Sequence, residues 1–520
     1  MANKRTPSSA GARAAPLSKV LSVLSIFFLT MANSSQAALQ PTGSSPSADG
    51  SRILPALKVA ENPPVSDAEE ARRVIAGKGK LTLEIYLRAI DSNFPGLKAA
   101  LDQQRIATAN RLEKQGVFDP LISNESGYTR MQNTSQIGAA KYVTFNYPKL
   151  ELPFRSGVRA FVQYRYNPLS AQSPYIETGR GGEISGGVFI PLLRGFIYNE
   201  QSVAEKEAKL GEQLATQTFS LTRLDTLLKS GNVYWGWLGA NEKRKVAAHI
   251  LELAKLVVNI SQQQEQNGDL AKIYVAEAEE DLERRNADLL QNERDFQRFS
   301  YRLSSVLFDL GGTPLPLPTE QNCPDTIPRP EEFSPDETEK QVVMALSLRP
   351  ELKAIDIQAK VAELQLKLAE NQLLPAANLV ATEGHDAGFK GIGHSYRGQI
   401  TFSQPLYLRT ARGKIHAAKL RLAKLKKDRQ AEEQRIRNEV YDAISAINLA
   451  FKRFEALERQ VSKAEQVYFG ERERFQAGDS TVFLVAERER QLNEAKMRTI
   501  DAQIEYHNGV LALKAISTRL

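Results

Sequence analysis

The chain has 520 residues, of which 42% are hydrophobic and 25% are charged. This mixture is typical of long amphipathic helices rather than of one large globular core. The 68 basic and 61 acidic side chains leave a net charge of only +7, and charge interspersed in this way argues against a nucleic-acid-binding face.

Residues 1–37 are predicted to be a signal peptide. Basic residues, the last of which is Lys19, precede an apolar run from Val20 to Ala32 that is too short to span a membrane. Ser35 and Ala37 supply the small side chains that signal peptidase requires, so cleavage is expected directly after Ala37. The alternative is an uncleaved N-terminal anchor. The first interpretation predicts that the mature chain is exported.

The rest of the chain lacks the features of two other membrane classes. No stretch of 18 or more apolar residues follows the signal, which excludes an inner-membrane helix bundle. The sole cysteine, Cys323, excludes an intrachain disulfide, and the absence of cysteine from positions 38–60 speaks against a lipoprotein.

Two segments are expected to lie outside the repeated part of the chain. Residues 38–80, whose first part is rich in Ser, Pro, Gly and Ala, are predicted to form a flexible N-terminal tail. Residues 311–337 are rich in proline and divide the remaining chain into two parts of similar size. We therefore interpret 311–337 as a linker.

The two parts, 81–310 and 338–520, are copies of one unit. FPGLKAA at 94–100 matches RPELKAI at 349–355, and Asn-Gly-Asp at 267–269 matches Ala-Gly-Asp at 477–479. The first matching pair lies 255 positions apart and the second pair 210, so the first copy carries about 45 extra residues in its middle. Such duplication decides the architecture more than any single motif does.

Each copy is predicted to contain a helix, a group of β-strands and a long helical hairpin. The opening helices are expected over 81–116 and 338–374. The strands are expected over about 117–192 and about 376–408. The hairpins are expected over 199–310 and 412–520.

The second hairpin has the clearest periodicity. Apolar residues recur there every seven positions, as in a coiled-coil seam: Val440, Ile447, Phe454, Val461, Tyr468 and Phe475. A helix from about 414 to 476 would be about 95 Å long. Gly478 is expected to end it and Asp479 to N-cap the returning helix, and Gly268 and Asp269 hold the matching positions in the first copy.

About two strands per copy, or four per chain, cannot close a barrel. Every backbone polar group inside a membrane must be paired, and single-chain bacterial barrels begin at about eight strands. Strands from several chains must therefore combine if they face lipid. The segment 132–153 of the first copy has no assigned place, and either extends an external loop or adds a strand excursion.

These features together resemble the TolC family of outer-membrane efflux and secretion channels. The resemblance rests on the doubled openings LTLE…NFPGLKAA and ALSLRPELKAI, the strand boundaries VFDP, LLPA, IPLLRGF and SQPLYLR, and the NGD and AGD tips. It implies a mostly α-helical fold with a β-barrel part. In that fold, a homotrimer shares a twelve-stranded barrel in outer-membrane lipid, and twelve helices with an equatorial belt form a tunnel in the periplasm.

The resemblance also implies a passive conduit. An inner-membrane pump supplies the energy and a periplasmic adaptor couples it to the channel, at tips that correspond here to Gly268, Asp269, Gly478 and Asp479. Family members often have a hydrophobic or small residue after the tip glycine, where this chain has Asp. The alternative role for Asp269 and Asp479 is helix N-capping alone.

Acidic rings often narrow the tunnel in this family, six and nine residues past the second tip glycine. The sixth position here is Leu484, or Tyr274 in the first copy, so one ring is lost. The ninth is acidic in both copies, which makes Glu277 and Glu487 candidates for a constriction. The alternative is that both lie on solvated helix faces, paired with neighbours such as Arg284 or Arg488.

An enzyme is not expected, and neither is a cofactor. The five histidines form no HExxH or paired metal-ligand spacing, although His385 and His394 flank one glycine-containing loop. The basic run 419–429 is interpreted as a solvated helix face, and Trp235 and Trp237 as packing residues. The alternative function is a structural periplasmic coiled-coil tether without a pore. The sequence does not identify the exported substrate.

Overall fold

A computed structural model describes residues 66–77, 79–132, 140–167, 178–179, 181–268, 270–333, 338–386 and 393–518. The chain divides into two units, Met1–Asn62 and Pro63–Leu520, and all described residues belong to the second. The predicted signal peptide and the first part of the predicted tail lie outside the described residues.

Two helices open each copy, where a single helix was predicted. These are α3 (Leu83–Asn93) and α4 (Pro95–Gln115) in the first copy, and α7 (Thr338–Leu348) and α8 (Pro350–Asn371) in the second. Each break falls at a proline, Pro95 or Pro350, which begins a new helix because it lacks the N–H that a continuing helix needs.

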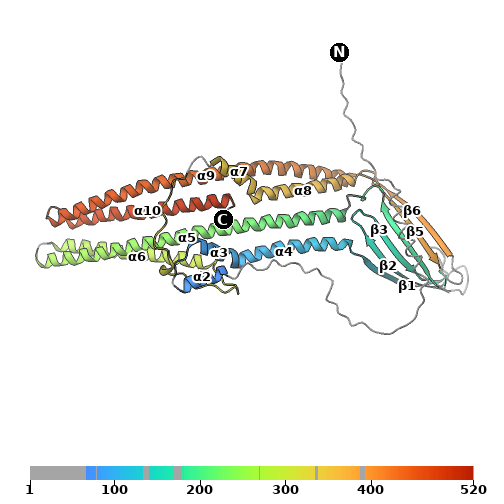
Figure 1. Cartoon of the computed structure of the whole chain (residues 1–520), viewed down its shortest axis with the longest axis horizontal. Helices are drawn as coiled ribbons and strands as arrows, with labels where there is room; N and C mark the ends of the chain where they lie inside the picture. Colours follow the sequence, from blue (N-terminus) through green and yellow to red (C-terminus); the bar gives the residue numbers. More distant parts are fainter. Residues whose placement is uncertain are drawn as a thin grey trace, which may run out of the picture. The chain divides into compact units, whose positions relative to one another are not determined.

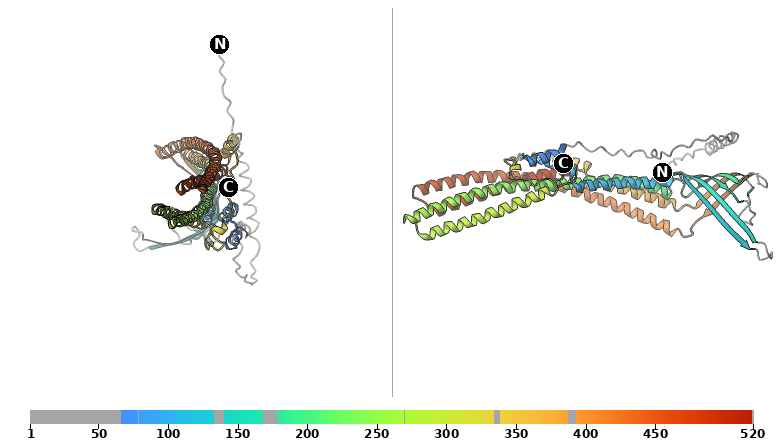
Figure 2. Two further views of the ribbon diagram at one scale, coloured as in Figure 1. Left: turned by 90° about the vertical axis from the view of Figure 1, so that its left-hand side faces the viewer. Right: turned by 90° about the horizontal axis from the view of Figure 1, so that it is seen from below.

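Two long hairpins follow, and they lie side by side along one axis (Figures 1 and 2). The first pairs α5 (Glu200–Gln266) with α6 (Lys272–Ser304), and the second pairs α9 (Arg409–Gln476) with α10 (Val482–Ile516). The 68 residues of α9 correspond to about 100 Å. The predicted seam is buried where α9 contacts α10, at Val440, Ile447 and Phe454.

Close contact between the hairpins depends on glycine in α5. A Cβ atom added at Gly239 would lie 1.9 Å from Cδ1 of Ile504 in α10, and one at Gly231 would lie 2.2 Å from Cδ2 of Leu511. These glycines cost some helix propensity, but they allow α10 to pack directly against the α5 backbone.

One antiparallel sheet of six strands lies at the end of the unit opposite the hairpin tips (Figure 1). Its strands pair in chain order: β1 (Leu121–Gln132), β2 (Ala140–Pro153), β3 (Arg159–Arg165), β4 (Glu183–Pro191), β5 (Ala376–Asp386) and β6 (Gly393–Ser403). The prediction of four strands per chain was therefore wrong. Pro148 and Pro153 interrupt the pattern of β2, and proline normally argues against a strand interior.

The core near the middle of the helices gathers residues from distant parts of the sequence. Trp237 is fully buried and its Nε1 donates to Oγ of Ser300 (3.0 Å), while the Tyr234 hydroxyl donates to the Leu81 carbonyl (2.9 Å). Trp235 is also buried. The prediction that both tryptophans serve packing is confirmed.

The predicted tail and linker both contribute to this core. Residues Ser66–Ala76 form helix α2, with Ala71 and Ile75 buried, so the prediction that 38–80 is flexible throughout was wrong. The linker buries Leu315, Cys323 and Ile327 in the same cluster. Asn322 donates to the carbonyls of Val74, Ile75 and Gly79, and so fastens the linker to the end of α2.

None of the described helices is both long enough and apolar enough to cross a membrane.

Candidate pore sheet and hairpin tips

The strand register divides the side chains of the sheet between two faces, because successive residues of a strand point to opposite sides. Ile122 pairs with Leu150, Leu150 with Val162, and Val162 with Gly186. We call the face that carries these residues the outer face. The opposite face, which carries Glu151 and its partner Phe161, is called the inner face.

The outer face is largely apolar and exposed, although it also carries Glu383 and the polar side chains of Asn124, Ser126 and Asn146. Nine large apolar or aromatic side chains on it are between 37% and 80% exposed: Ile122, Tyr128, Leu150, Val162, Tyr166, Ile184, Tyr396, Ile400 and Phe402. On the inner face, Leu121 at the start of β1 is the one comparable side chain among those whose burial is described. An extended exposed apolar surface of this kind fits contact with lipid.

The inner face carries a buried ionic network. The Glu183 carboxylate is 1% exposed and accepts from Arg165 (2.8 Å), Arg397 (2.7 Å) and the Ser395 hydroxyl (2.9 Å). Nearby, the Asp386 carboxylate accepts from the backbone N–H of Gly179 (2.8 Å). These residues come from four separate strands and a loop, so only the folded sheet brings them together.

A second ionic group lies closer to the helices on the same face. The Glu151 carboxylate accepts from Lys149 (2.5 Å) and from Arg159 (3.2 Å). The Arg159 guanidinium also stacks over the Phe189 ring at 4.2 Å. An apolar outer face and a charged inner face together suit a wall between lipid and water.

The hairpin tips have the predicted glycines in the left-handed conformation. Gly268 has φ +83° and Gly478 has φ +85°, and a Cβ atom added at either would meet no atom within 4 Å. After Gly478, the Asp479 N–H donates back to the Arg474 carbonyl (2.9 Å). These glycines therefore end α5 and α9 by backbone geometry.

The aspartates after the tip glycines do not have the predicted capping role in α10. Thr481 is the N-cap of α10, and its hydroxyl accepts from the Leu484 N–H (3.4 Å), so the prediction for Asp479 was wrong. Thr481 lies two residues further on, where the chain has extended backbone angles. Ala271 is the N-cap residue of α6, and Asp269 lies outside the described residues.

The constriction candidates lie in the returning helices near the tips. Glu487 of α10 accepts from Arg490 (2.6 Å) and Gln491 (2.8 Å), and its pKa falls to about 2, mainly because of these hydrogen bonds. The sequence suggested Arg488 as its partner, whereas the ion pair forms with Arg490. Glu277 of α6 is exposed.

A half-buried acid two residues beyond Glu487, Glu489, was missed from the sequence, because it lies in the charged run ERER. Burial raises the pKa of Glu489 to about 7, an effect opposed by Arg285 and reinforced by Asp281, both of α6. Burial, reinforced by the Glu489 charge, raises the pKa of Tyr468 in α9. Glu489 therefore lies where α10 faces both neighbouring helices.

The raised pKa of the half-buried Glu489 predicts a pH-dependent stability of the tip region. The native state holds the Glu489 proton more tightly than the unfolded chain does, so stability falls as pH rises from about 4.5 to about 7. Glu489→Gln should remove this loss, which amounts to at most about 3 kcal/mol at pH 8. Hydrogen exchange of α10 at pH 4.5 and pH 8 measures it. The control is Glu494→Gln, because Glu494 is exposed. Equal hydrogen-exchange protection of α10 in Glu489→Gln and in wild type at pH 8 would contradict the prediction.

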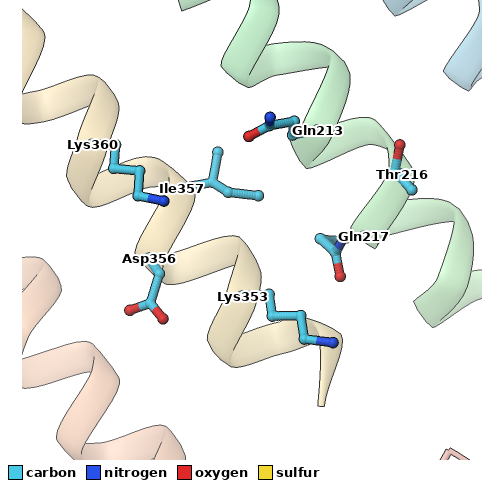
Figure 3. Close-up of a pocket in the computed structure, with 7 residues that line it drawn as sticks. All are labelled: Gln213, Thr216, Gln217, Lys353, Asp356, Ile357 and Lys360. Atoms are coloured by element: carbon cyan, nitrogen blue, oxygen red, sulfur yellow. The ribbon is translucent and has the colours of Figure 1, made fainter. Parts of the chain in front are cut away.

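Other candidate sites offer little chemistry. A hollow of about 350 Å³ between α5 and α8 is lined mostly by polar side chains, such as Gln213, Lys353 and Asp356 (Figure 3). His385 and His394 pair across β5 and β6 with ring centroids 4.7 Å apart. Within the described part of the chain, no group of three His, Cys, Asp or Glu side chains is placed to hold a metal ion.

The basic run of α9 lies along the α8–α9 contact. Arg429 bonds to Asp356 (2.9 Å) and to Glu433, and Arg421 bonds to Gln365 (2.9 Å). Lys424 pairs with Asp428 (2.6 Å). Arg421, Lys424 and Arg429 of this run thus have partners within the helical part of the chain.

An exposed amphipathic sheet joined to long helical hairpins is the arrangement found in the TolC-like fold, and comparisons with known proteins support this fold. Residues 342–518 match the family model described as outer membrane efflux protein. No curated protein matches the chain in sequence.

Solved structures with this fold include three bacterial membrane proteins. A membrane protein from Pseudomonas aeruginosa is 13% identical, with TM-score 0.63 and coverage of 84% of this chain and 92% of that one. The outer membrane protein VceC from Vibrio cholerae is 16% identical (TM-score 0.62; 84% and 96%). The CmeC outer membrane channel from Campylobacter jejuni is 14% identical (TM-score 0.62; 92% and 94%).

The second copy therefore carries an outer membrane efflux protein domain, and the chain as a whole has the TolC-like fold. The mostly helical fold class with a β-sheet part, as predicted, is confirmed.

Proposed function

We propose that the protein is the passive exit duct of a tripartite export system. Three copies would share one barrel in the outer membrane and one helical tunnel in the periplasm. The observation that carries this proposal is the two-sided sheet, whose apolar outer face and ionic inner face suit lipid on one side and water on the other. Its margins, β1 and β6, need partners because unpaired backbone is not tolerated in lipid.

The hairpin tips are the proposed contact with a periplasmic adaptor, through which an inner-membrane pump would act on the channel. Gly268 and Gly478 mark the two turns, and Asp269 and Asp479 follow them. Exposed apolar side chains next to the turns, Ile273 and Tyr274 in α6 and Phe483 in α10, support a protein contact there.

The assembly can be tested with the purified full-length chain. We expect it in the outer-membrane fraction, and native mass spectrometry in detergent should give the mass of three copies. A monomer in the soluble periplasmic fraction would contradict the proposal and would favour a coiled-coil tether instead.

We further propose that Glu487, with Glu277 of the first copy, forms an acidic ring that narrows the tunnel near the tips. Three or six carboxylates around a narrow bore favour cations and repel one another. The pKa of Glu487, lowered to about 2, keeps it charged at neutral pH.

Replacing this acid should loosen the closed channel. Glu487→Ala is expected to raise the resting conductance in planar bilayers several-fold and to weaken cation preference. Glu494→Ala is the matched control, because Glu494 also pairs with Arg490 but lies two turns further along α10. Unchanged conductance of Glu487→Ala would place Glu487 away from the bore.

A further inference from the structure

The sheet contains an inserted pair of strands. Among the described residues, β5 and β6 are the strands that connect α8 to α9 in the second copy, whereas four strands connect α4 to α5 in the first copy. β1 follows Pro120 as β5 follows Pro375, and β4 ends at Pro191 before α5. The additional strands are therefore β2 and β3, which together with the turn between them account for more than half of the extra residues of the first copy.

The inserted strands are fully integrated into the hydrogen-bonded ladder. β1 pairs with β2 from Leu121↔Glu151 to Gln132↔Ala140, and β2 pairs with β3 from Lys149↔Gln163 to Pro153↔Arg159. β3 then pairs with β4 along its whole length. β1 reaches the rest of the sheet only through β2 and β3.

The turn between β2 and β3 is fixed to the start of α5. The Arg155 guanidinium makes two hydrogen bonds to the Glu205 carboxylate (2.7 and 2.6 Å), and Asn199 Nδ2 donates to the Arg155 carbonyl (2.9 Å). Gly157 has φ +82°, and a Cβ atom there would lie 2.3 Å from the Gly195 carbonyl oxygen. A loosely attached flap would not need such close anchoring.

The two faces of the sheet continue across the insertion. Ile122, Tyr128 and Leu150 are exposed on the outer face, at 80%, 62% and 38%. On the inner face, Glu125 of β1 and Lys149 of β2 carry charges. Ile122, Tyr128 and Leu150 thus give β1 and β2 an apolar part on the outer face, and Asn124, Ser126 and Asn146 form a hydrogen-bonded polar group on that same face.

We propose that the β2–β3 insertion enlarges the shared barrel from twelve to eighteen strands, with β1 of one copy pairing with β6 of the next. This proposal rests on the trimeric channel of the proposed function. The two margins lie on opposite sides of the sheet (Figure 1) and have similar lengths, 12 residues for β1 and 11 for β6. A second copy of the chain is therefore a suitable partner for each margin.

The consequence is a wider outer-membrane pore. Barrel diameter grows about linearly with the number of strands, so eighteen strands would give about 1.5 times the diameter of twelve. The inner-face network around Glu183 would line this wider lumen in each copy.

Paired cysteines can identify the neighbouring strands. One cysteine replaces Tyr128 on β1, and the second replaces Tyr396, Gly398 or Ile400 on β6, all on the outer face; three β6 positions cover the possible registers. Cys323 does not interfere, because it is buried and burial raises the pKa of its thiol to about 12. The comparison series places the first cysteine at Tyr164 on β3.

We expect oxidation to give a covalent trimer with at least one of the β1–β6 cysteine pairs and with none of the β3–β6 cysteine pairs. In an eighteen-stranded barrel, two strands would separate β3 from β6 of the next copy, which is further than a disulfide can span. Covalent trimers from β3–β6 pairs would overturn the proposal in favour of twelve strands. Because cysteine variants can fail to assemble, the strands of the wild-type trimer in nanodiscs are also counted by electron cryomicroscopy. Eighteen supports the proposal and twelve overturns it, whereas a wild-type chain that forms no trimer contradicts the proposed function itself.

Discussion

Ile400→Arg should prevent stable insertion of the protein into the outer membrane. Ile400 is 71% exposed on the outer face of β6, where we place lipid. An arginine facing lipid near the bilayer midplane costs about 2–4 kcal/mol, and an assembly of three copies bears this cost three times. We expect little or no heat-stable trimer in outer-membrane fractions, as judged by gel mobility with and without heating.

The neighbouring residue provides a matched control for this prediction. Gln399 is adjacent in sequence but points to the inner face, opposite Val380. Gln399→Arg adds the same side chain and should insert normally, with a shift of ion selectivity toward anions. Equal insertion of the two variants would show that the faces are assigned wrongly.

Glu183→Ala should both destabilise the sheet and change its ion selectivity. The substitution removes the shared partner of Arg165 and Arg397, and Arg165 is only 12% exposed. Removing one partner of a buried ion pair typically costs about 3–5 kcal/mol. We expect a lower temperature of trimer dissociation and a pore more selective for anions.

Two further variants complete this experiment: one separates the loss of charge at Glu183 from the loss of its contacts, and the other is a control at a different position. Glu183→Gln keeps a side-chain acceptor for Arg165 and should dissociate at an intermediate temperature. Glu125→Ala removes an exposed acid from the same face and should leave the dissociation temperature unchanged. A Glu183→Ala trimer as stable as wild type would contradict a structural role for the network.

The helical part of the fold could be predicted from the sequence because its signals are local and repeated. The seven-residue spacing from Val440 to Phe475 matches helix α9, and the tip glycines Gly268 and Gly478 adopt the left-handed geometry that ends a helix. The break at Pro95 was missed, because the apolar pattern continues across it.

The sheet was harder to predict because its signals are weaker. A strand that faces lipid and water has only short alternation, and Pro148 lies inside β2. The segment 132–153 was left without a place for this reason. The register pairs Leu150 of this segment with Ile122 and Val162, and only this pairing reveals the outer face.

Some candidate sites could be predicted from local sequence, whereas others form only when distant residues meet in the fold. Tip positions follow from local sequence, but the network of Arg165, Glu183 and Arg397 joins residues far apart in the chain. The acid near the tips that has an unusual environment is Glu489, whose pKa depends on burial and on charged groups of α6. The sequence identifies Glu487 by its spacing from Gly478 and contains no comparable signal for Glu489.

Conductance of the purified full-length protein in planar bilayers tests the central claim most directly. We expect discrete steps of stable conductance from a trimer, with ion selectivity that changes in Gln399→Arg and Glu183→Ala, because both positions lie on the inner face. A correctly assembled protein that inserts into the bilayer without conductance, or whose selectivity ignores both substitutions, would contradict the assignment of the inner face to a pore.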